Sequence, residues 1–263
     1  MTDSCRPSTR RLVAGAQAPF SVRHAGANAP FLLIGDHAGC DIPPALGDLG
    51  LPPAELARHI GWDIGVAELG AQLADRLDAC FIAQRFSRLV IDCNRDPARP
   101  DAICEVSDGT PVPGNLRLSA ADRQLRIDEV FAPYHRRIED EITARTARGQ
   151  ATLLVALHSF TPVMGGASRP WRYGVLHLGA SPFSDAVLAR LRERLGAEVV
   201  GDNQPYQMDE TDYTVPHHAV AHGLDYVELE VRQDLLADPA GIAAAAALLA
   251  PVLEDALAGL NTG

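Results

Sequence analysis

The sequence predicts an α/β domain of three layers, in which a mixed, mostly parallel β-sheet is flanked by helices. The first observation is that apolar runs of strand length alternate with helical segments of about 10 to 25 residues. The second is that 263 residues, 47% of them apolar, show no internal repeat and no clear linker. A chain of this size can bury one core. We therefore expect an N-terminal arm over residues 1–29 and a single domain over residues 30–263.

The first half of the chain supplies three expected strands and two helices. A strand over 31–34 leads into a Gly- and Pro-rich turn, and a helix over 53–77 follows from apolar residues at helical spacing, broken near Gly61. Strands are expected at 80–83 and 87–95, before a Pro-rich loop over 96–118 whose length is typical of functional loops. Ser119 and Asp122 form a capping pattern that begins a helix ending near Arg148, with a kink expected at Pro133.

The second half continues the alternation of strands and helices. Runs of β-forming apolar residues predict strands at 151–157, 173–178, 198–200 and 224–231. Helices are expected at 182–195, 217–222 and 239–260, the last of them rich in alanine.

The charge balance excludes several partners and chemistries. The net charge is −11, and such an acidic surface repels nucleic acid and anionic lipid. All basic side chains among the 23 are arginines, which excludes lysine Schiff-base and P-loop chemistry. We see no apolar run near the roughly 18 residues of a membrane span and no signal-peptide core. We expect a cytoplasmic monomer or homodimer with no nucleic-acid or membrane partner.

The cysteines predict free thiols. They are five in number and contain no C-x-x-C pair, so neither a disulfide framework nor a cysteine-based zinc site fits (Cys5, Cys40, Cys80, Cys93, Cys104). Cys40 lies close to His37 in the sequence. A role for Cys40 at the rim of a site, or as a nucleophile, is the alternative, although no activating partner is specified.

Three expected strands end in residues that a metal ion could use. Residues 31–37, 153–158 and 226–230 are apolar runs that reach His37, His158 and Glu230. Ligands bind outside the carboxyl ends of strands in open α/β sheets. Two histidines and a carboxylate at one sheet edge are the materials of a catalytic zinc site.

The carboxylate ligand has two candidates. Asp63 lies in Gly-Trp-Asp-Ile-Gly near the first helix, and Asp41 follows His37 closely. Asp36 is expected to point to the opposite side of the chain from His37. We prefer Asp63, with Asp41 as the alternative.

A period of two places Glu228, Glu230 and Arg232 on one face of the last strand. This pattern is typical of the solvated face of an edge strand, or of a general base or acid held beside a metal site. Glu230 is the better candidate for the base because it lies nearer the end of the strand.

Further residues could bind an anionic substrate. Asn94 and Arg95 close an expected strand, and a fixed arginine can bind a carboxylate through two hydrogen bonds. Arg169 lies in a Gly- and Pro-containing loop and could clamp an anion. His218 could donate to an oxyanion or cap a helix.

Together these segments resemble the N-formylglutamate amidohydrolase family. No single motif is specific, but the ordered set spans about residues 31–236: Asp-His-Ala-Gly at 36–39, His-Ile-Gly-Trp-Asp-Ile-Gly at 59–65, Ser-Arg-Leu-Val-Ile-Asp-Cys-Asn-Arg-Asp-Pro at 87–97, Leu-His-Ser-Phe-Thr-Pro at 157–162, Asn-Gln-Pro-Tyr at 203–206, Tyr-Thr-Val-Pro-His-His-Ala at 213–219 and Glu-Leu-Glu-Val-Arg-Gln-Asp-Leu at 228–235.

The resemblance implies a phosphorylase/hydrolase-like fold similar to that of zinc carboxypeptidases. It implies one Zn²⁺ per chain on His37, Asp63 and His158, with Glu230 as the catalytic base. It also implies a small anionic N-acyl amino acid substrate, bound by Asn94 and Arg95, with Arg169, His218 and Arg232 as further binding candidates. The carboxypeptidase H-x-x-E spacing is absent, because Cys40 stands at the position of that glutamate.

The expected activity is hydrolysis of an amide bond, for example of N-formyl-L-glutamate to formate and glutamate. Zinc would lower the pKa of a water molecule, Glu230 would accept its proton, and Arg95 or His218 would assist at the oxyanion. The alternatives are an amidase or peptidase acting on another small acyl-amino acid or peptide, and a non-catalytic binding protein with the same fold.

Overall fold

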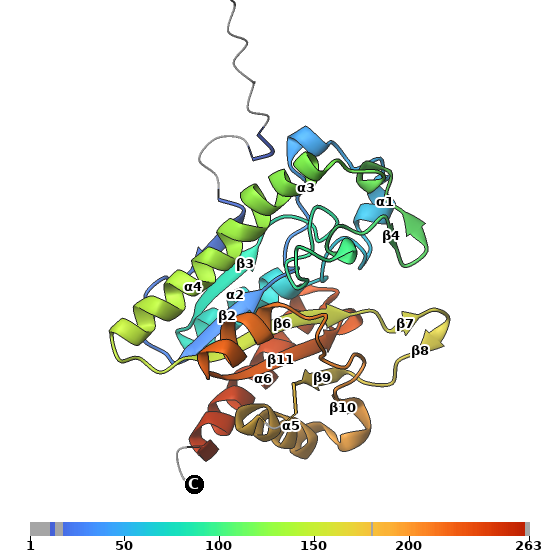
Figure 1. Cartoon of the computed structure of the whole chain (residues 1–263). Coiled ribbons are helices and arrows are strands. Elements are labelled where there is room, and N and C mark those ends of the chain that lie inside the picture. Colours follow the sequence, from blue (N-terminus) through green and yellow to red (C-terminus); the bar gives the residue numbers. More distant parts are fainter. Residues whose placement is uncertain (1–10, 14–17, 180, 261–263) are drawn as a thin grey trace, which may run out of the picture.

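The computed structural model describes residues 11–13, 18–179 and 181–260. Its central feature is a seven-stranded sheet with helices on both faces (Figure 1). In spatial order the strands are β1 (Phe20–Arg23), β3 (Cys80–Gln84), β2 (Phe31–Gly35), β6 (Leu153–Phe160), β11 (Asp225–Arg232), β9 (Tyr173–Leu176) and β10 (Val200–Asp202).

The sheet is mixed and mostly parallel, as predicted. Strands β3, β2, β6 and β11 are parallel neighbours, whereas β1 pairs antiparallel with β3 and β9 pairs antiparallel with β11. Strand β10 is parallel to β9. The carboxyl ends of β2, β6 and β11 therefore meet at one edge, which is where their predicted site residues lie.

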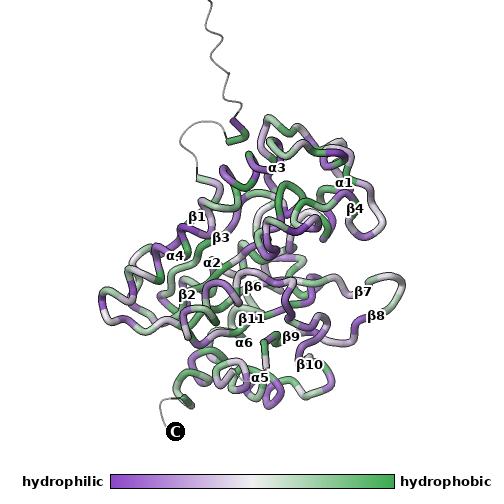
Figure 2. Tube along the Cα trace, in the orientation of Figure 1, coloured by the Kyte–Doolittle hydropathy of each residue, from purple (hydrophilic) through white to green (hydrophobic). Residues whose placement is uncertain are grey.

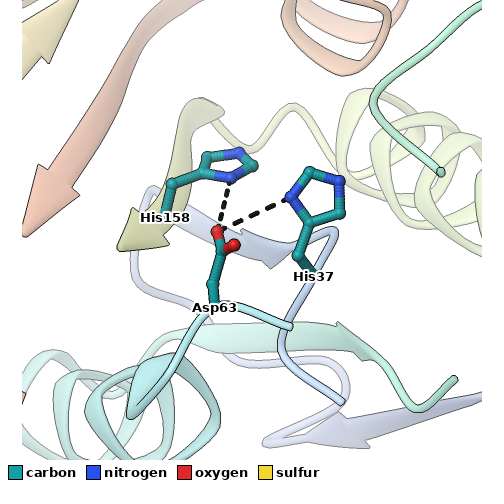
Figure 3. A group of neighbouring side chains, drawn as sticks. All are labelled: His37, Asp63 and His158. Carbon is teal, nitrogen blue, oxygen red and sulfur yellow. Dashed lines mark hydrogen bonds and ion pairs between the residues drawn. The ribbon is translucent and has the colours of Figure 1, made fainter. Parts of the chain in front are cut away.

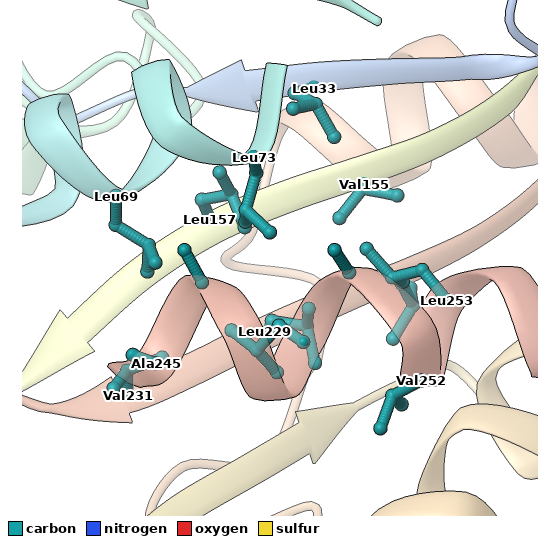
Figure 4. Packing of buried hydrophobic residues seen from close by; sticks show 14 of the residues in the cluster. Leu33, Leu69, Leu73, Val155, Leu157, Leu229, Val231, Ala245, Val252 and Leu253 are labelled. Atoms are coloured by element: carbon teal, nitrogen blue, oxygen red, sulfur yellow. The ribbon is translucent and has the colours of Figure 1, made fainter. Parts of the chain in front are cut away.

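Helices cover the two faces of the sheet and complete the three predicted layers. On one face α2 (Val66–Leu77), α5 (Pro182–Leu195) and α6 (Pro239–Leu260) pack against odd-numbered strand residues, among them Leu33, Val155 and Leu229 (Figure 4). On the other face α4 (Ala132–Ala147) packs against even-numbered residues such as Leu32 and Ala156. In Figure 2 the hydrophobic colour follows the strands at the centre of the molecule.

The helix expected over 53–77 is two helices. Helix α1 covers only Pro53–Leu56, and α2 begins at Val66. Between them the chain turns, and Gly65 precedes α2 with a φ of 82°. A Cβ at Gly65 would lie 2.5 Å from the Cβ of Leu236, so only glycine fits. The turn before α2 carries Asp63.

The prediction of a strand over 87–95 is wrong. These residues are turns and coil, although most are buried. These residues are apolar because they are buried beyond the end of the sheet. There, side chains form the hydrogen bonds to the backbone that a neighbouring strand would otherwise form. Arg126 donates to the carbonyl of Val90 (2.8 Å), and Asn115 donates to the carbonyl of Leu89 (2.9 Å).

The long helix expected from Ser119 is confirmed, with a π-helical turn inside it. Helix α3 (Ala120–Arg126) continues through a π turn at Ile127–Phe131 into α4. Ser119 caps its beginning, accepting from the amide of Asp122. Pro133 has no N–H and its ring crowds the preceding turn, which the wider π turn accommodates.

The remaining elements are short. The loop over 96–118 contains the 3-10 turns Pro100–Ile103 and Pro113–Asn115 and the hairpin of β4 (Val106–Ser107) and β5 (Thr110–Pro111). A second hairpin pairs β7 (Val163–Met164) with β8 (Ala167–Ser168). The helix expected at 217–222 is a π turn at Val215–Ala219 followed by a 3-10 turn at Val220–His222. Other 3-10 turns cover Pro44–Leu46, Ala197–Val199 and Gln233–Leu236.

Two expectations about the chain ends change. Of the N-terminal arm, residues 1–10 and 14–17 lie outside the described residues, and residues 20–23 form the edge strand β1. Helix α6 spans 22 residues and is long and apolar enough to cross a membrane, contrary to our expectation that no segment would be. One face of α6 belongs to the core beside α2 and α5, as a core helix of a globular domain requires.

Candidate active site

A cleft of about 570 Å³ opens at the carboxyl ends of β2, β6 and β11. Its lining includes His37, Asp63 and His158, together with Glu228 and Glu230. Residues of the loop over 96–118 and of the segment over 206–212 form its outer walls. The three strand ends singled out in the sequence therefore meet in one cavity.

His37, Asp63 and His158 form a buried group of potential metal ligands (Figure 3). Their ligand atoms lie within 4.8 Å of one another. Oδ2 of Asp63 is 3.5 Å from Nδ1 of His37 and 2.9 Å from Nδ1 of His158. Asp41, the alternative ligand, is exposed and lies 3.6 Å from Arg85. The geometry thus unites the preferred three residues and leaves Asp41 apart.

Main-chain contacts fix the positions of these side chains. His37 lies in the turn after β2, and its carbonyl accepts a hydrogen bond from the amide of Asp63 (2.8 Å). His158 lies inside β6, two residues before its end, so its backbone is held by sheet hydrogen bonds. The amide of Ser159 also donates to Oδ2 of Asp63 (3.2 Å).

Each histidine has a second carboxylate behind it. Nε2 of His37 lies 2.7 Å from Oδ1 of Asp92, and Nε2 of His158 lies 3.5 Å from Oδ2 of Asp36. Asp36 is anchored by the hydroxyl of Tyr134 (2.8 Å). A carboxylate at the outer nitrogen orients a histidine and leaves its other nitrogen for a metal.

The donor set fits a zinc ion. Nδ1 of His37 is buried and has no hydrogen-bond partner. Two imidazole nitrogens and one carboxylate oxygen are the ligands of a catalytic zinc site, which keeps one position for water. Burial lowers the pKa of His158, but Glu228, Asp36 and Asp63 outweigh it and hold this pKa well above the usual value. The site therefore attracts positive charge.

Glu228 and Glu230 are both buried and both line the cleft. Glu230 is the register partner of His158 on β6, so the two side chains lie next to each other on one face of the sheet. Burial raises the pKa of each glutamate to about 8. Oε2 of each has no partner among the described residues. The alternative of a solvated edge face is excluded, because β11 lies between β6 and β9.

Gly174 allows the opposite wall to approach the glutamate. It is the register partner of Glu230 on β9. A Cβ at Gly174 would lie 2.1 Å from the carbonyl oxygen of Gln204 and 3.2 Å from the Cβ of Glu230. Any larger residue would push the following segment, which carries Tyr206, away from the cleft.

Arg88 is a site residue that the sequence analysis did not single out. Its Nη2 lies 2.6 Å from Oδ2 of Asp92, and its Nη1 lies 3.5 Å from Oδ1 of Asp63. It lines the cleft, and the buried carboxylates of Asp92 and Asp63 raise its pKa against the effect of burial. The motif at 87–97 contains this arginine. Because these residues form coil and not a strand, the alternation of a strand could not predict which of their side chains face the cleft.

Asn94 and Arg95 both line the cleft, as the sequence suggested, but they already bind an internal carboxylate. Nδ2 of Asn94 donates to Oδ1 of Asp212 (3.2 Å), and Nη1 of Arg95 donates to the same oxygen (3.1 Å). Oδ1 of Asn94 accepts from the amides of Tyr213 and Thr214, both at 2.9 Å.

The other candidate binding residues are outside the lining of the cleft. Arg169 donates to the hydroxyl of Tyr206 (2.9 Å), and its guanidinium lies 4.6 Å from the centre of that ring, so it supports a wall residue. Arg232 binds Asp234 and the carbonyls of Arg169 and Trp171. The structure does not bring Arg232 to the cleft.

His218 and Cys40 are also apart from the cleft lining. His218 is fully buried behind the site, with Nε2 2.9 Å from Nδ1 of His135. Burial lowers the pKa of His218 to about 3, so it is neutral at ordinary pH. Cys40 is largely exposed, and the partial burial of its thiol together with nearby Asp41 raises its pKa, the opposite of an activated nucleophile.

Comparison with known proteins gives a family and a set of similar structures that includes the following two. Residues 29–237 match the family N-formylglutamate amidohydrolase. A gene product of Agrobacterium tumefaciens, Atu2144, is similar in structure with a TM-score of 0.91 and 35% identity, covering 95% of this chain and 100% of that one. An N-formylglutamate amidohydrolase from Ralstonia eutropha JMP134 shares the fold with a TM-score of 0.65 and 21% identity, covering 90% and 96%. No curated protein sequence matches.

Proposed function

Because this chain belongs to the N-formylglutamate amidohydrolase family, we propose that it is a zinc-dependent hydrolase that cleaves the amide bond of a small N-acyl amino acid. N-formyl-L-glutamate, giving formate and glutamate, is the reference substrate. The observation that supports this most directly is the buried group of His37, Asp63 and His158 beside Glu230 in one cleft.

The three ligands would hold one zinc ion per chain, with Asp92 orienting His37 through a hydrogen bond and the Asp36 carboxylate 3.5 Å from Nε2 of His158. A zinc ion in such a site lowers the pKa of a water molecule and polarises a carbonyl group. The neighbouring carboxylates favour a divalent cation, since they already raise the pKa of both His37 and His158.

Glu230 is the proposed general base. Its register pairing with His158 supports this role, since Glu230 lies beside the ligand group and its Oε2 has no hydrogen-bond partner among the described residues. A bound divalent cation would lower its pKa and favour the ionised form that a base needs. A base in this position takes the proton of the attacking water and passes it to the nitrogen of the leaving amino acid. Glu228, two residues earlier on the same strand face, lies farther from the strand end and is the matched comparison.

Arg88 and the pair of Asn94 and Arg95 supply positive charge and donors for the substrate. The guanidinium of Arg88, held beside Asp63, is suited to stabilise negative charge that develops on the attacked carbonyl oxygen. Asn94 and Arg95 lie on another wall of the same cleft and would bind the carboxylate of the amino acid.

We place the enzyme in the cytoplasm, acting on a soluble small molecule as a monomer or homodimer. Free thiols at Cys40, Cys80, Cys93 and Cys104 support a reducing compartment. The cleft of about 570 Å³ is of the size that binds small molecules.

The test is an activity screen on metal-stripped and zinc-reloaded protein. N-formyl and N-acetyl derivatives of glutamate, glutamine and alanine are the substrates, and release of the free amino acid is measured. We expect turnover only after reloading, with zinc near one per chain. Substrate binding without turnover would instead show a binding protein.

Glu230→Gln is the decisive variant, and Glu228→Gln is its matched control. Glu230→Gln should keep its zinc and lose more than about 100-fold in turnover, since a general base contributes roughly 100- to 10,000-fold. Turnover in Glu230→Gln equal to that in Glu228→Gln would remove the base assignment. Loss of activity on alkylation of Cys40, with indifference to chelators, would point to a cysteine hydrolase.

A further inference from the structure

The outer wall of the cleft carries an acidic side chain at the proposed carboxylate-binding pair. We define the wall segment as residues 206–214, which follow β10 and lead into the π turn at Val215–Ala219. Tyr206, Asp209 and Asp212 of this segment line the cleft. Asp212 is the one whose carboxylate reaches Asn94 and Arg95.

Both oxygens of Asp212 are in use. Oδ1 accepts from Nδ2 of Asn94 at 3.2 Å and from Nη1 of Arg95 at 3.1 Å. Oδ2 accepts from the backbone amide of Asp209 at 3.0 Å, which closes a turn in the wall segment. The side chains of Arg95 and Asp212 are only 25% and 13% exposed, so the pair is partly shielded from solvent.

The orientation of Asn94 allows no alternative. Its Oδ1 accepts from two backbone amides, those of Tyr213 and Thr214. An amide flip would turn its NH2 group toward these two donors and lose both hydrogen bonds. Nδ2 of Asn94 is therefore fixed in the direction of Asp212. A substrate carboxylate that binds at Nδ2 of Asn94 and Nη1 of Arg95 competes with Asp212 for these two donors.

We propose that Asp212 is a specificity-determining residue, which competes with the carboxylate of the substrate for Asn94 and Arg95. The inference rests on the proposed function, because it takes that pair as the carboxylate subsite. When a carboxylate ligand binds, Oδ1 of Asp212 gives up its hydrogen bonds with Nδ2 of Asn94 and Nη1 of Arg95. The turn of the wall segment then moves with Asp212. The affinity for a carboxylate is then reduced by the fraction of molecules in which Asp212 holds the subsite.

The surroundings strengthen the competition. Asp209 lies on the same wall segment and also lines the cleft. Like charges within a few ångströms repel most strongly where solvent is partly excluded. With Asp212 in place, an incoming carboxylate meets an acidic wall and a partly neutralised arginine. With Asp212 neutral, it meets the full charge of Arg95.

Equilibrium titration of the zinc-loaded protein with glutarate tests this. Glutarate carries the carboxylates of the substrate without a scissile bond, and the neutral diamide glutaramide is the comparison ligand. We expect Asp212→Asn to bind glutarate at least about fivefold more tightly than the unmodified protein, as expected when a competitor held by one ion pair is removed. Asp212→Ala, which also removes the acceptor, should tighten binding at least as much, and glutaramide binding should not change.

Two control variants make the outcome specific. Glu210→Gln removes one negative charge from an exposed position outside the lining of the cleft, and it should leave glutarate affinity within about twofold. Arg95→Ala should weaken glutarate binding whether or not Asp212 is replaced. Tightening in Asp212→Asn that is absent in Glu210→Gln supports the competition.

Other outcomes overturn it. Unchanged or weaker glutarate binding in Asp212→Asn and Asp212→Ala would show that Asp212 orients the pair instead of competing with the ligand. No effect of Arg95→Ala would show that carboxylates bind elsewhere, which ends this inference. Neither result tests the proposed hydrolase activity. That proposal is refuted only if the zinc-loaded protein turns over no N-acyl amino acid.

Discussion

Asp92 offers the sharpest test of the metal centre, because it contacts the proposed metal ligand His37 but is not itself a proposed ligand. Its Oδ1 lies 2.7 Å from Nε2 of His37, and its Oδ2 lies 2.6 Å from Nη2 of Arg88. Asp92→Asn keeps the shape of the side chain and removes its charge. The new amide nitrogen would face either the histidine N–H or the guanidinium, and both are donors.

The expected magnitude follows from the role of the contact. Loss of a carboxylate behind a ligating histidine typically weakens metal binding 10- to 100-fold. At about 1.4 kcal/mol per tenfold change, this corresponds to roughly 1.4 to 2.7 kcal/mol in the free energy of zinc binding. The upper half of this range is expected, since Asp92 is buried and its Oδ1 is the carboxylate oxygen that contacts Nε2 of His37.

The assay is a competitive zinc titration against a chromophoric chelator at constant pH and ionic strength. Asp101→Asn is the matched control, because Asp101 lines the same cleft but pairs with Arg99 instead of a histidine. We expect the control to keep its zinc affinity within about twofold. If Asp92→Asn binds zinc as tightly as the unmodified protein, or if Asp101→Asn loses as much, then His37 is not a ligand oriented by Asp92.

Three further predictions concern the ligands, the pH response and the scaffold. His158→Ala should abolish stoichiometric zinc binding, measured by metal analysis after dialysis; unchanged zinc content would remove His158 from the ligand set. In metal-free protein, folding raises the pKa of Glu230 from 4.5 to about 8, so its contribution to stability is complete below pH 4.5 and is lost as the pH rises through 8. The melting temperature of Glu230→Gln should therefore rise relative to the unmodified protein between pH 5 and 8, and a constant difference would contradict the shift. Arg145, fully buried, donates to Glu141 and to the carbonyl of Phe31, so Arg145→Met should cost roughly 3–5 kcal/mol in urea unfolding while zinc per folded chain stays constant.

The sequence predicted the elements that carry strong periodicity. Helices at 182–195 and 239–260 have the expected bounds, and the three strands that end in His37, His158 and Glu230 adjoin as expected. These predictions succeeded because parallel buried strands read as continuous apolar runs and share one carboxyl edge.

Parts of the site depend on contacts that sequence pattern does not encode. Residues 87–95 read as a strand, yet Arg126 and Asn115 hold them as buried coil, and so the direction of Arg88 was hidden. The contact of Asp212 with Arg95 joins positions 117 residues apart. Arg232 lay on the predicted face of β11, but it is the last residue of that strand and reaches a neighbouring loop.

The position of β11 inside the sheet has a consequence for amide hydrogen exchange. Its backbone is hydrogen-bonded to β6 on one side and to β9 on the other, and no separate loop opening can expose the amides around Glu230. Those amides should exchange at the rate of global unfolding, whereas amides of the turn at Asp209–Asp212, on the surface of the cleft, should exchange through local opening. Deuterium uptake can therefore follow the substrate-side wall at times when the strand with the proposed base remains fully protected.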